Sequence, residues 1–252
     1  MSQTHLTLIT GASRGLGAAL AAQRLHEGHH VIGISRQRSP ELTALAQARG
    51  ATLEQWAIDL AEPQQAARHL GDWLAAQSGA VFASATLINN AGVVTVPGPL
   101  ADTPPAEAAR GLRVGLEAAL LLTAVFLDET RDWPGPRKVL NISSGLGRRA
   151  MAGSAVYCAA KAGMDHFTRA VALEQAMLPR GAQVVSLAPG IIDTDMQVEL
   201  RTANPTAFPE RERFMQFKAS GQLDTPAAAA RKVLAHLDRK DFGQNPVADV
   251  RE

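Results

Sequence analysis

The chain has 252 residues, 46% of them hydrophobic and 19% charged, enough for one large domain with its own core. With 25 basic and 24 acidic residues the net charge is +1, so no strong field would attract nucleic acid or an anionic membrane surface. One cysteine excludes a disulfide framework, and the histidines lack metal-ligand spacing. The sequence has no signal-peptide pattern and no apolar run long enough to span a membrane, so we expect a cytoplasmic protein. We expect one domain over residues 1–252, with no metal, nucleic-acid or membrane partner.

Short apolar runs alternate with segments of helical periodicity along most of the chain. Strands are predicted at 6–10, 30–35, 137–144 and 182–190, within 51–60, and at 85–92, where the strand runs into a turn, with an edge strand at 245–250. Helices are predicted over 16–28, 40–50, 64–77, 107–131, 154–177 and 225–240. Because the strands are nearly all apolar, the pattern predicts an α/β fold. The predicted fold is a doubly wound, Rossmann-like parallel sheet with helices on both faces.

Residues 193–224 interrupt this alternation. The segment is mixed in composition and follows a predicted strand end, where ligand sites gather in open α/β sheets. We therefore expect it to form a lid over a cleft.

A glycine-rich loop, TGASRGLG at 10–17, separates the first strand from the first helix. Gly11, Gly15 and Gly17 would let the backbone turn and approach a pyrophosphate, which the helix N-terminus attracts. The spacing is G-x-x-x-G-x-G rather than the common G-x-G-x-x-G, and a glycine-rich turn without a ligand is the alternative. The position directly after the first strand favours dinucleotide binding.

The end of the second predicted strand lacks the carboxylate that usually holds the ribose 2′-hydroxyl of NAD. The strand ends at Ser35, Arg36 and Arg38 come after it, and Arg14 lies inside the glycine loop. Guanidinium groups pair with a 2′-phosphate through charge-assisted hydrogen bonds. Solvated surface arginines are the alternative, but the combined pattern favours NADP(H), with Arg14 and Arg36 stronger candidates than Arg38.

Tyr157 and Lys161 lie four residues apart in AVYCAAKAGM at 155–164, on one face of a predicted helix. A free tyrosine has a pKa of about 10, and an ammonium one turn away would lower that pKa by stabilising the phenolate. Ser144, at the end of the fifth strand, could donate a hydrogen bond to a carbonyl oxygen beside the phenol. Such a pair is common by chance, but beside a nucleotide loop it indicates transfer of hydride and proton together.

In combination, these motifs resemble the short-chain dehydrogenase/reductase family over essentially the whole chain. They are TGASRGLG at 10–17, DL at 59–60, NNAG at 89–92, NISS at 141–144, YCAAK at 157–161 and PGIIDT at 189–194. The resemblance implies that Tyr157 is the general acid/base and that Lys161 lowers its pKa and binds the nicotinamide ribose. It also implies that Ser144 orients the substrate carbonyl, with Ser143 the weaker candidate.

The resemblance further implies a set of cofactor contacts. Asp59 would contact the adenine, and Asn89 and its neighbours would line the cofactor. Pro189 and Gly190 would pass the nicotinamide, while Ile192 and Thr194 would hold its carboxamide. The full expected set is Gly11, Ser13, Arg14, Gly15, Leu16, Gly17, Ser35, Arg36, Asp59, Leu60, Asn89, Ala91, Gly92, Tyr157, Lys161, Pro189, Gly190, Ile192 and Thr194.

Within the family, residues 171–197 and the lid segment AFPERERFMQFKASGQL are similar to the benzil reductase and sepiapterin reductase-like group. That similarity implies NADPH-dependent reduction of a ketone or diketone, benzil-like or with a pterin-like side-chain carbonyl. The lid side chains Phe208, Phe214, Met215 and Phe217 would either bind an apolar substrate or pack the lid onto the body.

Two other functions stay open: a non-catalytic NADP(H)-binding sensor or scaffold, and an NAD-dependent alcohol dehydrogenase, which Arg14 and Arg36 disfavour. The long helices at 107–131 and 154–177 commonly build a four-helix interface in this family, which implies a homodimer or homotetramer.

One position departs from the family pattern. Most members carry an asparagine on the long central helix that completes a Ser–Tyr–Lys–Asn set, and Gly115 stands in the matching stretch RVGLEA. Glycine has no side chain to hold the water of the proton relay, and inside a helix it costs about 1 kcal/mol relative to alanine. Either water alone fills the gap or activity is reduced.

We predict that Gly115→Asn keeps or raises turnover, because the amide would hold the relay water that glycine cannot hold. Steady-state assays of ketone reduction, run on the variant and the unchanged protein, measure this effect. A large loss of turnover in a folded variant would show that Gly115 does not match the asparagine of the family.

Overall fold

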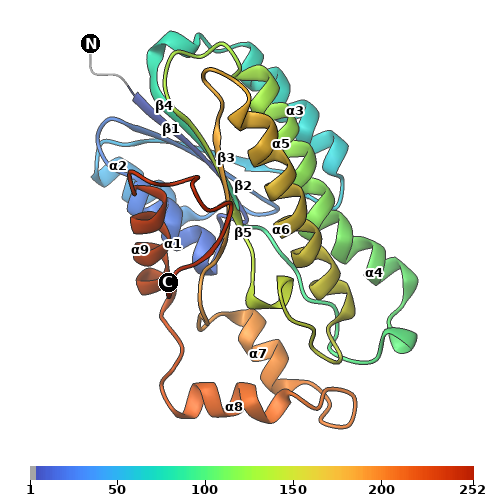
Figure 1. Ribbon diagram of the computed structural model, residues 1–252. Helices are drawn as coiled ribbons and strands as arrows, with labels where there is room; N and C mark the ends of the chain where they lie inside the picture. The colour runs from blue at the N-terminus through green and yellow to red at the C-terminus, as the bar shows by residue number, and fades with distance from the viewer. Residues whose placement is uncertain (1–3) are drawn as a thin grey trace.

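The apolar runs form a seven-stranded parallel sheet in the computed structural model, which describes residues 4–252 (Figure 1). The strands are β1 (Thr4–Thr10), β2 (His29–Ser35), β3 (Thr52–Ala57), β4 (Phe82–Asn89), β5 (Arg137–Ile142), β6 (Gln183–Ala188) and β7 (Val247–Asp249). Their order in the sheet is β3-β2-β1-β4-β5-β6-β7, and every neighbouring pair is parallel. The predicted doubly wound α/β fold is confirmed.

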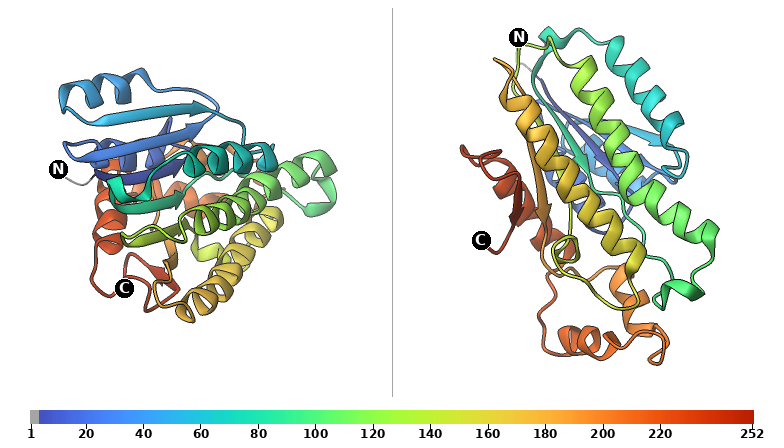
Figure 2. Two further views of the ribbon diagram at one scale, coloured as in Figure 1. Left: turned by 90° about the horizontal axis from the view of Figure 1, so that it is seen from above. Right: turned by 45° about the vertical axis from the view of Figure 1, so that its right-hand side comes forward.

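Helices cover both faces of this sheet, as the views in Figure 2 show. They are α1 (Gly15–Arg24), α2 (Pro40–Ala48), α3 (Pro63–Ala75), α4 (Pro105–Leu112), α5 (Ala118–Glu129), α6 (Ala155–Ala176), α7 (Asp195–Thr202), α8 (Arg211–Ala219) and α9 (Pro226–Leu237). Short 3₁₀ turns are η1 (Gly79–Val81), η2 (Leu100–Asp102) and η4 (Gly145–Gly147). Within residues 4–252, no helix combines the length and the apolar character needed to cross a membrane.

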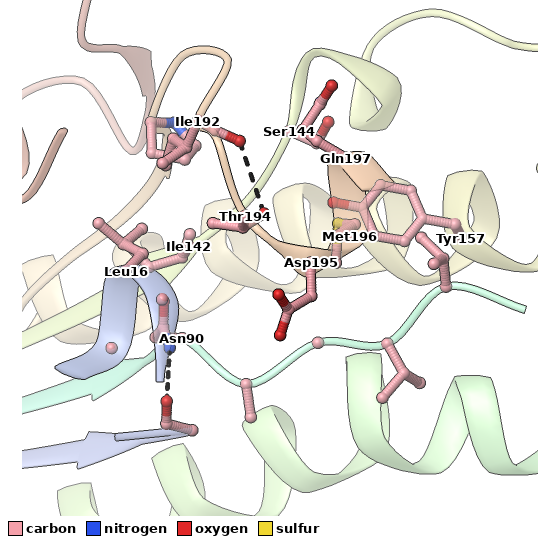
Figure 3. A pocket seen from close by; sticks show the side chains of 18 of the residues that line it. Leu16, Asn90, Ile142, Ser144, Tyr157, Ile192, Thr194, Asp195, Met196 and Gln197 are labelled. Atoms are coloured by element: carbon pink, nitrogen blue, oxygen red, sulfur yellow. Dashed lines mark hydrogen bonds between the residues drawn. The ribbon is translucent and has the colours of Figure 1, made fainter. Parts of the chain in front are cut away.

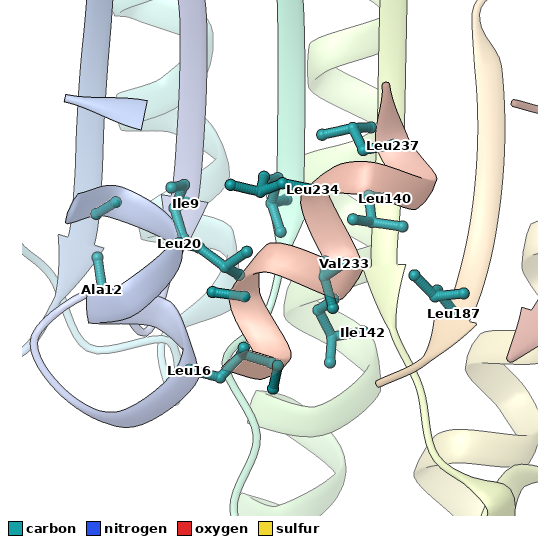
Figure 4. Close-up of a cluster of buried hydrophobic side chains, with 14 of the residues drawn as sticks. Ile9, Ala12, Leu16, Leu20, Leu140, Ile142, Leu187, Val233, Leu234 and Leu237 are labelled. Atoms are coloured by element: carbon teal, nitrogen blue, oxygen red, sulfur yellow. The ribbon is translucent and has the colours of Figure 1, made fainter. Parts of the chain in front are cut away.

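The two faces of the sheet bury different members of each strand. Ile9 of β1 packs in a cluster with α1, α2 and α9 (Figure 4), whereas its neighbour Leu8 packs in a cluster with α3 and α5. Leu140 and Val139 of β5 divide in the same way. Successive side chains of a strand point to opposite faces, so a strand covered on both faces needs an apolar residue at nearly every position.

The strand order creates the place where a ligand can bind. β3 lies at one edge, and the chain then crosses β2 and β1 to enter the sheet again at β4. The loops that follow β1 and β4 therefore diverge, which opens a crevice at the carboxyl ends of the strands. In a doubly wound sheet this switch point is the expected position of a nucleotide site.

The long central helix is not uniform. Between α4 and α5 the segment η3 (Arg113–Glu117) is π-helical, although the sequence predicts one regular helix over 107–131. Gly115 is buried in this segment, and a Cβ at this position would lie 3.1 Å from the Cβ of Ala160 on α6. Because an asparagine at 115 would start from this tight contact, Gly115→Ala is the matched control for the asparagine variant.

The segment 193–224 folds into α7 and α8, which lie beyond the carboxyl edge of the sheet (Figure 1). It has its own small core, formed by Leu200, Phe208 and Phe214 with Leu146 and Met151 of the body. A parallel bridge between Ile192 and Asp224 joins the two ends of the segment. The packing holds α7 and α8 over the loops that follow β5 and β6.

Candidate active site

A cleft of about 880 Å³ opens at the carboxyl ends of the strands. The loops after β1 to β6 and the first residues of α6 and α7 form its walls. All the predicted site residues except Asn89 line it. They are Gly11, Ser13, Arg14, Gly15, Leu16, Gly17, Ser35, Arg36, Asp59, Leu60, Ala91, Gly92, Ser144, Tyr157, Lys161, Pro189, Gly190, Ile192 and Thr194.

The structure corrects the expected position of Asn89. This side chain is only 2% exposed, and its Nδ2 donates to Oδ1 of Asn141 at 2.8 Å and to Oγ1 of Thr123 at 3.0 Å. As the last residue of β4 it points into the helix layer, and the next residue, Asn90, lines the cleft instead. The amide of Asn90 donates to the carbonyl of Thr10 at 2.9 Å and so holds the start of the glycine loop.

The glycine loop has the geometry that a pyrophosphate needs. Gly15 has a φ of +56°, a left-handed conformation that other residues rarely adopt. A Cβ on Gly17 would collide with the carbonyl oxygen of Gly11, so only glycine lets the loop fold back on α1. No side chain caps the start of α1, and its first N–H groups are therefore open to an anion.

The arginines near the adenine end differ in their surroundings. Arg36 follows β2, lines the cleft, is exposed, and has no ion-pair partner among residues 4–252. Nη1 of Arg14 lies 2.7 Å from Oδ2 of Asp195, which joins the glycine loop to the first turn of α7. Arg38 does not line the cleft. Arg36 is thus the guanidinium best placed for a 2′-phosphate. Arg14 would have to break its ion pair with Asp195 before it could bind such a phosphate.

The three candidate catalytic side chains come from two neighbouring segments. Tyr157 lies in the first turn of α6, Lys161 one turn later, and Ser144 directly before η4. Figure 3 shows Ser144 and Tyr157 together at one end of the cleft, with Leu16 and Asn90 at the other end. Nζ of Lys161 donates to the carbonyl of Ile142 at 2.6 Å and lies 5.7 Å from the centroid of the Tyr157 ring.

The protonation of this pair is governed by burial. Removal from water raises the pKa of the Tyr157 phenol to about 12, and a hydrogen bond with the Ser144 side chain opposes that rise. Burial lowers the pKa of the Lys161 ammonium to about 8, and the Asp165 carboxylate opposes that fall. The sequence predicts that Lys161 lowers the phenol pKa. In the structure burial outweighs the other effects and raises the pKa of the phenol, and the Lys161 ammonium, which donates to Ile142, is not among the groups that shift it.

Two polar side chains that sequence reasoning ranked low or missed also line the cleft. Ser143 and Gln197 are buried, and neither Oγ of Ser143 nor Oε1 of Gln197 has a hydrogen-bond partner. Gln197 lies in the first turn of α7, near Tyr157 and Ser144 (Figure 3). Its place three residues after Thr194 is the one sequence signal that could have pointed to it. Buried orphan oxygens of this kind need a partner that a ligand can provide.

The aromatic side chains of the lid divide between the two roles left open by the sequence. Phe208 is fully buried in the lid core, and Met215 is exposed and does not line the cleft. Phe214 and Phe217 line the cleft at the end that holds Met151 and Leu200. Packing therefore accounts for Phe208, and an apolar substrate can contact the other two rings.

Among residues 4–252, no group of three or more metal-ligating side chains is arranged around a common point.

Comparisons with known proteins agree with this geometry. The family model for short chain dehydrogenase matches residues 5–205. Over 245 residues the chain is 33% identical to a benzil reductase, (S)-benzoin forming, of Bacillus cereus, covering 97% of this chain and 98% of that one. Over 249 residues it is 34% identical to the sepiapterin reductase of Meriones unguiculatus, covering 93% of this chain and 92% of that one.

A solved structure is also similar. A putative 2-deoxy-d-gluconate 3-dehydrogenase from Agrobacterium tumefaciens with bound NADP is 25% identical. The alignment has a TM-score of 0.79 and covers 98% of this chain and 95% of that one. Since the family model spans most of the chain and both relatives align along nearly its full length, the protein belongs to the short-chain dehydrogenase family.

Proposed function

We propose that this oxidoreductase is an NADPH-dependent carbonyl reductase that reduces a ketone or diketone. The observation that carries the proposal is the Tyr157 phenol, whose pKa burial raises, at one end of a cleft whose other end has a glycine loop and a free guanidinium. The named activities of the benzil and sepiapterin reductases, and the NADP bound to a solved relative, support it.

Each end of the cleft has a separate task. The glycine loop and the start of α1 would bind the pyrophosphate, and Arg36 would bind the 2′-phosphate. Lys161 would donate a hydrogen bond to the nicotinamide ribose. NADPH, when bound, supplies the hydride that adds to the carbonyl carbon of the substrate.

Tyr157 would supply the proton that the carbonyl oxygen gains. A phenol with a pKa of about 12 keeps its proton at neutral pH, the state that a general acid needs in the reductive direction. Ser144 would donate a hydrogen bond to the same oxygen and fix its position. The reverse reaction would need the phenolate, the form that this environment disfavours.

The lining of the substrate end indicates the substrate class. Phe214 and Phe217 offer an apolar surface, whereas Gln197 and Ser143 offer hydrogen-bonding groups without partners. A simple hydrocarbon ketone would leave those two groups unpaired, at a cost of about 1–3 kcal/mol each. A second oxygen next to the reacting carbonyl would pair with them on an aromatic or pterin-like substrate: the carbonyl of a vicinal diketone would accept from the Ser143 hydroxyl, and the hydroxyl of a hydroxyketone would donate to Oε1 of Gln197.

Two other functions are less well supported. A non-catalytic nucleotide sensor has no need for Ser144, Tyr157 and Lys161 on one cleft wall, and Gly115 is the one feature in its favour. An NAD-dependent alcohol dehydrogenase would leave Arg36 without its phosphate and would need the phenolate at neutral pH.

We also infer that the protein is a homodimer or homotetramer that works in the cytoplasm. α5 and α6 lie side by side in Figure 2, and three large apolar side chains on or next to them are exposed: Leu120 of α5, Leu173 of α6, and Met177 directly after α6. A second copy of the chain on this face would cover them.

We predict that Tyr157→Phe lowers kcat for reduction at least about 100-fold, because the variant keeps the ring and loses the proton donor. NADPH oxidation is followed with a panel of diketones, pterins and aldehydes. Fluorescence of bound NADPH serves as the control and should be unchanged. Undiminished reduction by the variant would overturn the proposed mechanism, and cofactor binding without turnover of any compound by the unchanged protein would favour the sensor.

The cofactor preference gives a second prediction. Arg36→Ala should raise KM for NADPH about tenfold or more and leave KM for NADH nearly unchanged, because the 2′-phosphate loses a charge-assisted hydrogen bond. Arg38→Ala removes an arginine two residues away that lies outside the cleft, and it should change neither constant. Equal effects of Arg36→Ala on the two cofactors would contradict the assignment.

A further inference from the structure

A second buried charge lies on α6, one turn beyond the lysine of the candidate active site. Asp165 follows Lys161 by four residues, so the two side chains share one face of the helix. Asp165 is 1% exposed and Lys161 is 3% exposed. Ionised side chains are almost never fully buried without a partner of opposite charge, so this carboxylate needs an explanation.

The surroundings hold Asp165 in place and keep water away from it. Its Oδ1 accepts a hydrogen bond of 2.6 Å from Oγ of Ser186 on β6. Its Oδ2 has no hydrogen-bond partner, although Nε of Arg148 lies 3.4 Å away. A Cβ on Gly147 would come within 2.7 Å of Oδ2, so the backbone of η4 covers this oxygen. The carboxylate therefore keeps negative charge that its neighbours only partly compensate.

The other charged groups near Lys161 either form ion pairs of their own or make no contact with Lys161. Arg148 also lies 3.9 Å from Asp249 of β7, and Asp249 accepts two hydrogen bonds from the Arg251 guanidinium at 2.8 and 2.6 Å and one from the Arg251 backbone N–H at 3.0 Å. β6 has no charged residue. Tyr157 is the other titratable group beside Lys161. The charged residues of α4, η3 and α5 form no ion pair or hydrogen bond with Lys161; they are Glu107, Arg110, Arg113, Glu117, Asp128 and Glu129.

We propose that Asp165 is a positioning residue that keeps the Lys161 side chain charged inside the cleft, and that Arg148 moderates its effect. The inference rests on the proposed function, since it explains how Lys161 can serve a protonated Tyr157 in a water-poor site. Ile142 offers Lys161 only a neutral carbonyl. Asp165 forms its ion pair with Arg148 and none with Lys161, so it would act on the ammonium through its charge alone. The direction of the Lys161 pKa agrees: burial lowers it and Asp165 opposes the fall.

Two substitutions should act with opposite signs. Asp165→Asn keeps the shape and an acceptor for Ser186 but removes the charge, so Lys161 would lose its proton at lower pH. The ratio of kcat/KM at about pH 9 to that at about pH 7 should fall about fivefold or more below the unchanged protein. Arg148→Gln removes the competing positive charge and should raise that ratio. Arg148→Lys, which keeps the positive charge, is the matched control for Arg148→Gln and should leave the ratio nearly unchanged.

A direct titration separates this inference from the proposed function. The ammonium of Lys161 can be followed by NMR with isotope-labelled lysine and assigned with Lys161→Met, whether or not any ketone is turned over. A lower titration midpoint in Asp165→Asn and a higher one in Arg148→Gln support the inference. An unchanged midpoint, or shifts in the same direction, would overturn it even if NADPH-dependent reduction is confirmed. If Asp165→Asn does not fold, the sign of the Arg148→Gln shift decides.

Discussion

The site depends on one buried contact, the hydrogen bond of 2.6 Å between the Lys161 ammonium and the carbonyl of Ile142. This bond ties the first turns of α6 to the end of β5, and so fixes Tyr157 beside Ser144 at the carboxyl edge of the sheet. An ammonium in this position is costly unless its charge is compensated. The fold compensates it with a carbonyl dipole and with the buried carboxylate of Asp165.

The architecture explains why these groups can stay close together and dry. α6 approaches the π-helical segment η3 at Gly115 and Ala160, where a single added Cβ would lie 3.1 Å from its neighbour. On the other side, α7 and α8 cover the cleft through a small core around Phe208. Tyr157 is half-buried at the wall of this cleft, and burial raises the pKa of its phenol to about 12. The same burial that makes Tyr157 a persistent proton donor also makes Lys161 depend on Asp165.

Sequence patterns predicted the fold, and nearly all of the predicted site residues line the cleft, because both depend on local signals. Alternating apolar strands and helices define a doubly wound sheet, and its loops meet at one edge. The position of Asn89 was wrong because a one-residue change at a strand end turns a side chain from the cleft into the helix layer. Gln197 was missed because its burial depends on how the lid packs, which no local pattern records. The direction of the Tyr157 pKa likewise depends on burial rather than on spacing.

The central claim is that Tyr157 keeps its proton until a substrate carbonyl takes it. Tyr157 is the only tyrosine in the sequence, so the ultraviolet absorbance of phenolate reports on this side chain alone. Titration of the folded protein, with circular dichroism to verify the fold, should show no ionisation near pH 10, whereas the denatured chain should ionise at about 10. A folded-state phenol that ionises at or below that value would contradict the claim.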